Sequence, residues 1–283
     1  MRFELDISPL DLDLTLGCGQ TFRWSCLADG SWAGVLGNQF VKIKRKGSTI
    51  EGDATPGGSD VESLVANFLR AKDDISRIQL ELGKDPIIAL GMRKMRGLRI
   101  VKLDEWECLI SYILATYANI PRIMKMVDSV ASEYGRKIAP GVHAFPERRL
   151  LAKASVGELA KLGLGYRAKY VHLACREIDE PALAEMMKTP YERLRTELIE
   201  LPGVGEKVAD CVSLFGFGRL ESFPIDVWIQ RALLRLYGVK GSYPKLRHFA
   251  IQKFGCFAGY AQEYLFHNER TMASKGACAF SNQ

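Results

Sequence analysis

The stretch that decides the fold is Leu198-Ile-Glu-Leu-Pro-Gly-Val-Gly-Glu-Lys-Val-Ala-Asp-Cys211. Its Pro-Gly-Val-Gly sequence predicts a tight hairpin at 201–205 between two segments of helical periodicity. Gly203 and Gly205 expose backbone N–H groups at the start of the second helix, where the helix dipole helps them to bind a phosphate group. A plain turn between two helices is the alternative interpretation of this stretch alone.

Two side chains near this turn suggest chemistry. Lys207 lies in the opening turn of the second helix, with Cys211 one turn later on the same face. The helix dipole opposes a positive charge there and so favours the neutral amine that a nucleophile needs. Nineteen residues later, Asp226 follows Pro-Ile at the start of another helix, where it could stabilise positive charge on a sugar. A solvated lysine and an N-cap aspartate are the ordinary alternatives, and we expect the rival carboxylate Asp210 to be structural.

The first 95 residues have a different pattern from the rest. Segments 32–36 and 39–44, joined by Gly-Asn, indicate a β-hairpin, and Asp60 is a plausible N-cap for an amphipathic helix. We therefore predict an α+β, mainly α fold. It has an N-terminal antiparallel β-sheet domain with helices at residues 1–95 and an all-α domain at residues 96–283.

The helical part carries its own boundary signals. Asp104 with Glu107 and Ser155 with Glu158 have the spacing of capping boxes, in which two side chains satisfy the first backbone N–H groups of a helix. The stretch 135–146, with two prolines, is expected to be a long loop.

Composition limits the class of protein. Among 283 residues, 47% are hydrophobic and the net charge is +6 with a pI near 8.9, which favours an anionic partner. Seven scattered Cys without a CxxC pair predict free thiols and a reducing compartment. We expect a cytoplasmic protein, which would be nucleoid-associated in a prokaryote and nuclear in a eukaryote. Cys256 and Cys278 are too far apart to hold an iron–sulfur cluster. We expect a monomer that uses no cofactor and does not enter a membrane.

The hairpin with its lysine and the later Pro-Ile-Asp resemble the helix–hairpin–helix (HhH-GPD) DNA glycosylase superfamily. The lysine places the resemblance in the branch of bifunctional glycosylase/lyases. Segments 19–24 (GQTFRW), 163–170 (GLGYRAKY) and 259–266 (GYAQEYLF) resemble the 8-oxoguanine DNA glycosylase family. The resemblance runs from about residue 12 to about residue 270. It implies that the enzyme flips 8-oxoguanine out of duplex DNA, that Lys207 attacks C1′, and that a Schiff base then undergoes β-elimination.

The resemblance also implies a base pocket. The carbonyl of Gly19 would accept the N7 hydrogen that distinguishes 8-oxoguanine from guanine, whose N7 is itself an acceptor. Gln262 would bond the Watson–Crick edge, and Phe266 and Cys211 would cover the two faces of the ring. A turn glycine and a core phenylalanine are the ordinary alternatives.

Further residues are expected at the DNA itself. In the family, Tyr166 would wedge into the duplex and Arg167 would contact the orphaned partner base. Tyr117 stands where vertebrate members have a hole-filling asparagine, and Trp228 replaces a family histidine, so this chain departs from the family in how it meets the opposite strand. The full set of expected DNA-binding residues is Asn119, Arg122, Tyr166, Arg167, Gly203, Gly205, Trp228 and Tyr117.

The expected partner is double-stranded DNA containing 8-oxoguanine. A basic surface would include Arg93, Lys94, Arg96, Arg99, Arg167 and Lys207. The superfamily resemblance also suggests a monovalent cation at the carbonyls of 202–205, while no redox cofactor or catalytic metal is implied. Two alternatives stay open: a glycosylase/lyase for another oxidised base, and a non-catalytic helix–hairpin–helix DNA-binding protein.

Overall fold

The computed structural model describes the backbone of residues 1–280 and the side chains of residues 1–271. The strands are β1 (Arg2–Asp6), β2 (Trp24–Cys26), β3 (Trp32–Leu36), β4 (Gln39–Lys46), β5 (Thr49–Thr55), β6 (Lys137–Ala139) and β7 (Val142–His143). The helices are α1 (Leu12–Gly17), α2 (Val61–Phe68), α3 (Ile75–Leu82), α4 (Pro86–Lys94), α5 (Glu105–Leu114), α6 (Ile120–Tyr134), α7 (Arg148–Leu151), α8 (Val156–Leu159), α9 (Arg167–Glu177), α10 (Glu180–Met186), α11 (Tyr191–Ile199), α12 (Glu206–Phe215), α13 (Val227–Tyr237), α14 (Tyr243–Phe254) and α15 (Ala258–Phe280). A π-helical turn, η1 (Ala160–Leu164), and a 3₁₀ turn, η2 (Gly255–Phe257), complete the elements.

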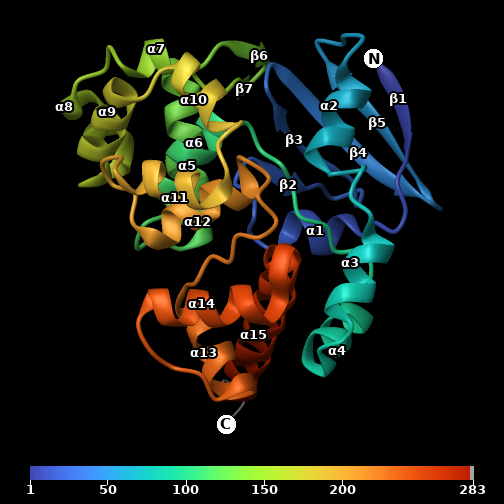
Figure 1. Ribbon diagram of the computed structural model, residues 1–283. Coiled ribbons are helices and arrows are strands. Elements are labelled where there is room, and N and C mark those ends of the chain that lie inside the picture. The colour runs from blue at the N-terminus through green and yellow to red at the C-terminus, as the bar shows by residue number, and fades with distance from the viewer. Residues whose placement is uncertain (281–283) are drawn as a thin grey trace.

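The N-terminal sheet is antiparallel, with the strand order β1-β5-β4-β3-β2, and α2 lies against it (Figure 1). The predicted hairpin is confirmed as β3 and β4, with Leu36 paired to Gln39. Gly37 has a φ of +53°, a value that glycine adopts without strain. Val41 and Ile43 alternate along β4 and are fully buried, so the period-two pattern correctly marked the inner face.

The region after residue 96 is helical, with one exception. Inside the expected loop 135–146, β6 and β7 form a short two-stranded hairpin, so the prediction of an entirely helical second part was wrong there. The capping box at Ser155 and Glu158 is confirmed. At Asp104 only half a box forms, because the side chain of Glu107 turns away to a buried ion pair with Arg23.

Helices from distant parts of the sequence pack together in the fold. Helix α4 packs against α15, and α1 lies at the centre of the view, near α15 and the sheet (Figure 1). One hydrophobic cluster contains core residues from both regions, such as Ile43 of the sheet and Val212 of α12. The domain boundary at residue 95 therefore stays a prediction, because one core extends across it. The end of α1 lies beside α15, where Arg270 donates to the Cys18 carbonyl at the site described next.

Within the described part of the chain, no helix combines the length and the apolar character needed to cross a membrane.

Candidate active site

A cavity of about 350 Å³ opens between the loop after α1 and helices α5, α6, α12, α13 and α15, and a recess of about 60 Å³ shares part of its wall. Five residues line both spaces: Gly19, Tyr112, Lys207, Asp226 and Phe266. The recess adds Cys211 and Gln262 to its wall. The structure thus brings the predicted nucleophile, carboxylate and base-pocket residues around one space. A larger hollow of about 630 Å³ lies on the sheet, lined largely by charged side chains and far from these residues in the fold.

Lys207 is positioned by the start of α12. Gly205 is the N-cap of this helix, so the Lys207 side chain leaves from the first turn. The Lys207 Nζ atom lies 5.1 Å from the centroid of the Tyr112 ring, and the side chain is close enough to the Cys211 thiol to affect its pKa. Burial raises the pKa of Cys211 to about 11 against the lowering effect of Lys207. Cys211 is therefore a neutral thiol and an apolar wall, which leaves the amine as the nucleophile beside it.

Asp226 is the N-cap of α13 and also faces the cavity. Its Oδ1 accepts hydrogen bonds from the backbone N–H groups of Trp228 and Ile229, each at 2.9 Å. Both capping bonds fall on Oδ1, so Oδ2 is available to the cavity that Lys207 also lines. Asp226 therefore caps α13 and also lines the cavity, although the sequence analysis treated the helix cap and the site residue as alternatives.

The position of Gly19 requires glycine for two reasons. Its φ is +102°, a conformation that other residues rarely adopt, and a Cβ there would lie 2.7 Å from Ile120 Cδ1. The same Cβ would lie 3.2 Å from Nη1 of Arg270, which donates to the neighbouring Cys18 carbonyl. The connection from α1 to β2 therefore brings main chain, with no intervening side chain, to the wall of both spaces.

Helix α15 supplies the deepest wall of the site. Gln262 is 5% exposed, and its Oε1 has no hydrogen-bond partner among the described residues. The Phe266 ring is partly buried, with the Arg270 guanidinium 5.4 Å from its centroid. The sequence interpretation missed Arg270 and Glu263, which also lines the recess. Glu263 follows Gln262 directly, and adjacent helical residues ordinarily point to different faces.

The hairpin between α11 and α12 has the predicted tight geometry. Gly203 has a φ of +82°, and a Cβ there would lie 2.6 Å from Cβ of Tyr170 in α9. Gly205 is exposed and caps α12 without a side chain. The turn therefore packs closely on α9 and presents bare backbone at the start of α12, while its contact with phosphate remains a prediction.

Tyr117 projects from a strained turn beside the cavity. Its φ is +50°, and its side chain is 93% exposed. Arg167 is 2% exposed and bonds the carbonyls of Thr116 and Tyr117, and the Tyr166 hydroxyl donates to Thr116 as well. The guanidinium of Arg167 is therefore engaged with this turn, and its predicted contact with the partner base stays untested.

The remaining predicted DNA-binding residues surround the mouth of the cavity. Asn119 caps α6 by accepting from the backbone N–H of Arg122 at 3.0 Å, and it lines the outer space. The Arg122 side chain is exposed. Trp228 also lines the outer space, with the Arg231 guanidinium 5.2 Å from its ring centroid. Their contacts with DNA remain predictions.

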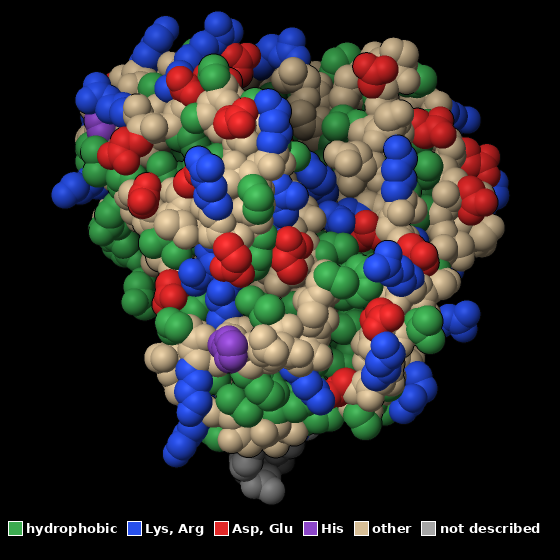
Figure 2. Space-filling model, viewed as in Figure 1, with side chains coloured by type: hydrophobic (Ala, Val, Ile, Leu, Met, Phe, Trp, Pro, Cys, Tyr) green, Lys and Arg blue, Asp and Glu red, His purple; other side chains and the backbone are tan. Residues whose placement is uncertain are grey.

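Two residues predicted on the basic surface, Arg99 and Arg167, are buried, so the prediction is wrong for both. Arg99 is 2% exposed, and its guanidinium donates to the carbonyls of Pro9 and Arg70, so it ties loops together inside the protein. Arg93, Lys94 and Arg96 are exposed. On the face seen in Figure 2, Lys and Arg side chains are interspersed with Asp and Glu. Charge patterning in the sequence could not separate Arg99 from its neighbours, because burial of an arginine needs carbonyl acceptors that only the fold supplies.

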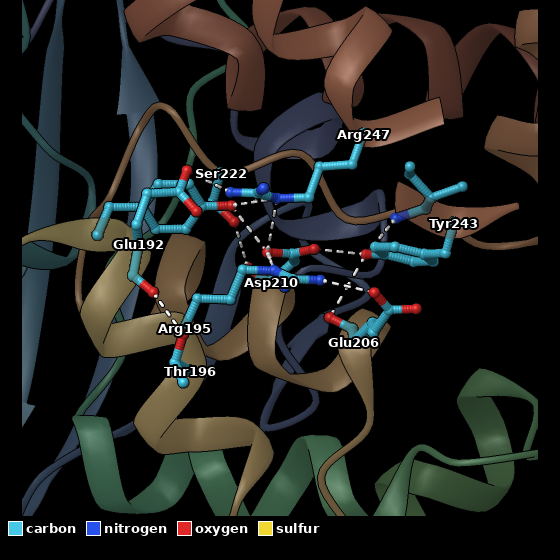
Figure 3. A network of polar contacts seen from close by, with 10 residues as sticks. Glu192, Arg195, Thr196, Glu206, Asp210, Ser222, Tyr243 and Arg247 are labelled. Carbon is cyan, nitrogen blue, oxygen red and sulfur yellow. Dashed lines mark hydrogen bonds and ion pairs between the residues drawn. The ribbon is translucent and has the colours of Figure 1, made fainter. Parts of the chain in front are cut away.

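Asp210 is structural, as expected, and holds the site together (Figure 3). It is fully buried and accepts hydrogen bonds from Tyr191, Arg195 and Tyr243 at 2.6–2.9 Å. The Tyr243 hydroxyl also accepts from the backbone N–H of Ile225, next to Asp226. This chain of bonds links the helix of Lys207 to the loop of Asp226.

Among residues 1–271 no three His, Cys, Asp or Glu side chains are grouped so that they could hold a metal ion. The predicted cation at the carbonyls of 202–205 remains a prediction. Cys278 lies outside the described side chains.

Comparisons with known proteins agree with this arrangement. Residues 2–109 match the N-terminal domain of 8-oxoguanine DNA glycosylase, and residues 110–254 match the HhH-GPD superfamily of base excision DNA repair proteins. The N-glycosylase/DNA lyase OGG1 of Arabidopsis thaliana is 31% identical, over 93% of this chain and 78% of that protein.

Two solved structures are similar along nearly the whole chain. A structure of MBOgg1 with a low-affinity DNA ligand has a TM-score of 0.90 and 34% identity, covering 96% of each chain. The 8-oxoguanine glycosylase/lyase of Clostridium acetobutylicum, in complex with double-stranded DNA containing cytosine opposite 8-oxoguanine, has a TM-score of 0.88 and 27% identity, covering 96% of this chain and 98% of that one. The chain belongs to the HhH-GPD superfamily of base excision DNA glycosylases and, within it, to the 8-oxoguanine DNA glycosylase/lyase family.

Proposed function

We propose that this protein flips 8-oxoguanine out of duplex DNA, cuts its glycosidic bond with Lys207 and then cleaves the strand at the abasic sugar. The observation that carries the proposal is that Lys207 and Asp226 line one cavity whose inner recess also holds Cys211, Gln262 and Phe266. A nucleophilic amine thus lies beside a carboxylate and next to a space with apolar walls and a few polar readers, which is what a flipped base needs.

The chemistry follows from these groups. The lone pair of the Lys207 amine forms a bond to C1′ as the bond from C1′ to the base breaks, and the electron pair leaves with the base. The free oxygen of Asp226 stabilises the positive charge that develops on the sugar. Opening of the sugar ring gives a Schiff base between Lys207 and C1′. Loss of a proton from C2′ then expels the 3′ phosphate by β-elimination.

The specificity for 8-oxoguanine is assigned to the recess. The main chain at Gly19 lines it without an intervening side chain, and a carbonyl there would accept the N7 hydrogen that guanine lacks. Gln262 Oε1, which has no hydrogen-bond partner among the described residues, would accept from the Watson–Crick edge. Phe266 and Cys211 would cover the two faces of the base.

The proposal extends to the working form of the protein. A related glycosylase/lyase solved in complex with double-stranded DNA containing cytosine opposite 8-oxoguanine supports such DNA as the partner, and the protein acts on it as a monomer in this proposal. The cysteines with described side chains are all free thiols, which supports a reducing, cytoplasmic compartment.

Borohydride trapping tests the chemistry. Reduction of the Schiff base would leave a covalent complex with an 8-oxoguanine duplex, and Lys207→Gln should abolish both the complex and base release while the duplex still binds. Lys84→Gln, which removes an exposed lysine paired with Glu81, is the matched control and should trap normally. A complex that persists with Lys207→Gln would place the nucleophile elsewhere. Trapping on an oxidised-pyrimidine duplex but not on 8-oxoguanine would reassign the lesion.

A further inference from the structure

A buried carboxyl group in the recess has no role in the chemistry above. Glu263 is 3% exposed and lines the recess together with Gln262 and Gly19. Its Oε2 has no hydrogen-bond partner among the described residues. A buried polar group without a partner is costly, so its persistence beside a ligand space indicates a partner that arrives with the ligand.

The surroundings of Glu263 favour its neutral form. Burial raises the pKa of this carboxyl group to about 7, with the nearby Asp226 carboxylate raising it further and the Cys18 thiol and Arg270 opposing. The titratable and charged groups around it are Cys18, Tyr112, Lys207, Cys211, Asp226 and Arg270. A neutral carboxyl group carries an O–H donor, which an ionised one lacks.

The position of Glu263 indicates which atom of the base it would meet. It follows Gln262 on α15, and it is close enough to Cys18, the residue before Gly19, for each group to shift the pKa of the other. In the proposed function Gln262 accepts from the Watson–Crick edge and Gly19 accepts from N7. The O6 carbonyl of a 6-oxopurine lies between those two edges and is an acceptor.

We propose that Glu263 is a base-binding residue whose neutral carboxyl group donates a hydrogen bond to the O6 carbonyl of the flipped base. This inference rests on the proposed assignment of the recess as the base pocket. The contact would favour 6-oxopurines, and it would stabilise negative charge on the departing base, because charge that collects on the ring after the glycosidic bond breaks reaches O6.

Binding as a function of pH tests the donor directly. Wild-type protein is titrated between pH 6 and 8.5 with a duplex carrying 2′-fluoro-8-oxo-2′-deoxyguanosine, since fluorine at C2′ opposes positive charge at C1′ and prevents cleavage. A duplex with a tetrahydrofuran abasic site, which has no base, corrects for other titrating groups. Because an acceptor partner raises the pKa of the donor in the complex, the corrected affinity should be constant below about pH 7 and then fall, by up to about tenfold per pH unit.

Two substitutions distinguish a donor from a charge. Glu263→Gln keeps the shape and supplies an amide N–H donor that does not titrate, so it should bind within about threefold of wild type at pH 6 and lose the fall above pH 7. Glu263→Leu has no donor and should bind about tenfold more weakly at pH 6, with no pH dependence. Glu107→Gln is the matched control, because Glu107 is also buried and has a pKa also raised to about 7, yet it pairs with Arg23 outside the recess. It should keep the wild-type pH dependence.

Each other outcome overturns the inference. Equal weakening of binding by Glu263→Gln and Glu263→Leu would show that the negative charge of Glu263 matters, and not its donor. Wild-type affinity in Glu263→Leu would show that Glu263 does not touch the base. Affinity that rises with pH would show that the ionised form of Glu263 binds. If Glu263→Leu fails to fold, the pH dependence of Glu263→Gln still decides. Borohydride trapping of the wild-type protein does not depend on Glu263. Normal trapping, together with Glu263 variants whose duplex affinity equals that of wild type, would therefore refute this inference and leave the proposed function standing.

Discussion

The buried guanidinium of Arg167 donates from Nη2 to the carbonyl oxygen of Tyr117 at 3.1 Å, and from Nε to that of Thr116 at 2.8 Å. These bonds hold Tyr117 in a left-handed conformation that costs a non-glycine residue roughly 1–2 kcal/mol. The result is an almost fully exposed aromatic ring on a fixed turn next to the cavity, with its supporting arginine already committed to the backbone.

The opposite base should matter little to this enzyme. Tyr117 offers a rigid ring that can fill the space of a flipped nucleotide by stacking, which every base tolerates, and Arg167 has its donors engaged in the turn. We therefore expect 8-oxoguanine to be removed opposite all four bases with a narrow spread of single-turnover rates. A preference for cytosine of about a hundredfold or more would contradict this expectation and would imply direct readout by Arg122 or Arg167.

Arg167→Lys should weaken binding to an abasic-site duplex by about tenfold, because an ammonium group cannot hold two carbonyls with a planar fork. If Arg167 acts through the Tyr117 turn, the loss should be much smaller in a Tyr117→Ala background, and a double-mutant cycle measures the difference. Additive losses in the two backgrounds would instead assign Arg167 a contact of its own with DNA.

Asp226→Asn should reduce the single-turnover rate by about 10²–10³-fold, because a neutral amide stabilises developing positive charge poorly. Asparagine is as good an N-cap as aspartate, so the melting temperature should hardly change. Asp179→Asn, at the N-cap of α10 and outside the cavity, is the control for capping alone. An Asp226→Asn enzyme with a near-normal rate would reduce Asp226 to a helix cap.

Phe266→Ala should weaken binding of an 8-oxoguanine duplex by on the order of 1–3 kcal/mol, the usual contribution of one base–aromatic stack. Undamaged duplex should bind as before, and Phe257→Ala, outside the cavity, serves as the matched control. Equal losses on both duplexes, or a steep fall in melting temperature, would make Phe266 a packing residue.

Asp210→Asn should lower the free energy of unfolding by about 3–5 kcal/mol, because it leaves Arg195 and Arg247 without their buried carboxylate. Once corrected for the folded fraction, the rate of base release should stay within a few-fold of wild type. Denaturant unfolding followed by single-turnover kinetics measures both quantities. A large loss of rate in fully folded protein would show that Asp210 positions Lys207 and Asp226 as well as stabilising the fold.

Local patterns were sufficient for several features. The β3–β4 hairpin, the boundaries of α12 and the N-cap at Asp226 depend on period, turn residues and capping, all of which act over a few residues of sequence. The Lys207 and Asp226 pairing was also accessible, because it rests on motifs with a defined spacing.

The recess was decided by tertiary structure. Residues 258–265 of α15 are buried without interruption, because α4, α13 and α14 pack around that end of the helix. On a helix that is buried all round, adjacent residues point in different directions but both point into the protein, so helical periodicity no longer separates buried from exposed positions. Gln262 and the adjacent Glu263 therefore both line the recess, although helical spacing alone indicated only Gln262 with Phe266.

The burial of two arginines was also decided by tertiary structure. The sequence by itself determined that Arg99 and Arg167 are charged, which is typical of exposed side chains and led to their prediction on a DNA-binding surface. Only the fold brought the carbonyls of Pro9, Arg70, Thr116 and Tyr117 to them, from segments up to 90 residues away. A guanidinium group is buried at tolerable cost when carbonyl acceptors replace its hydration, and the positions of those acceptors are set by packing between distant elements.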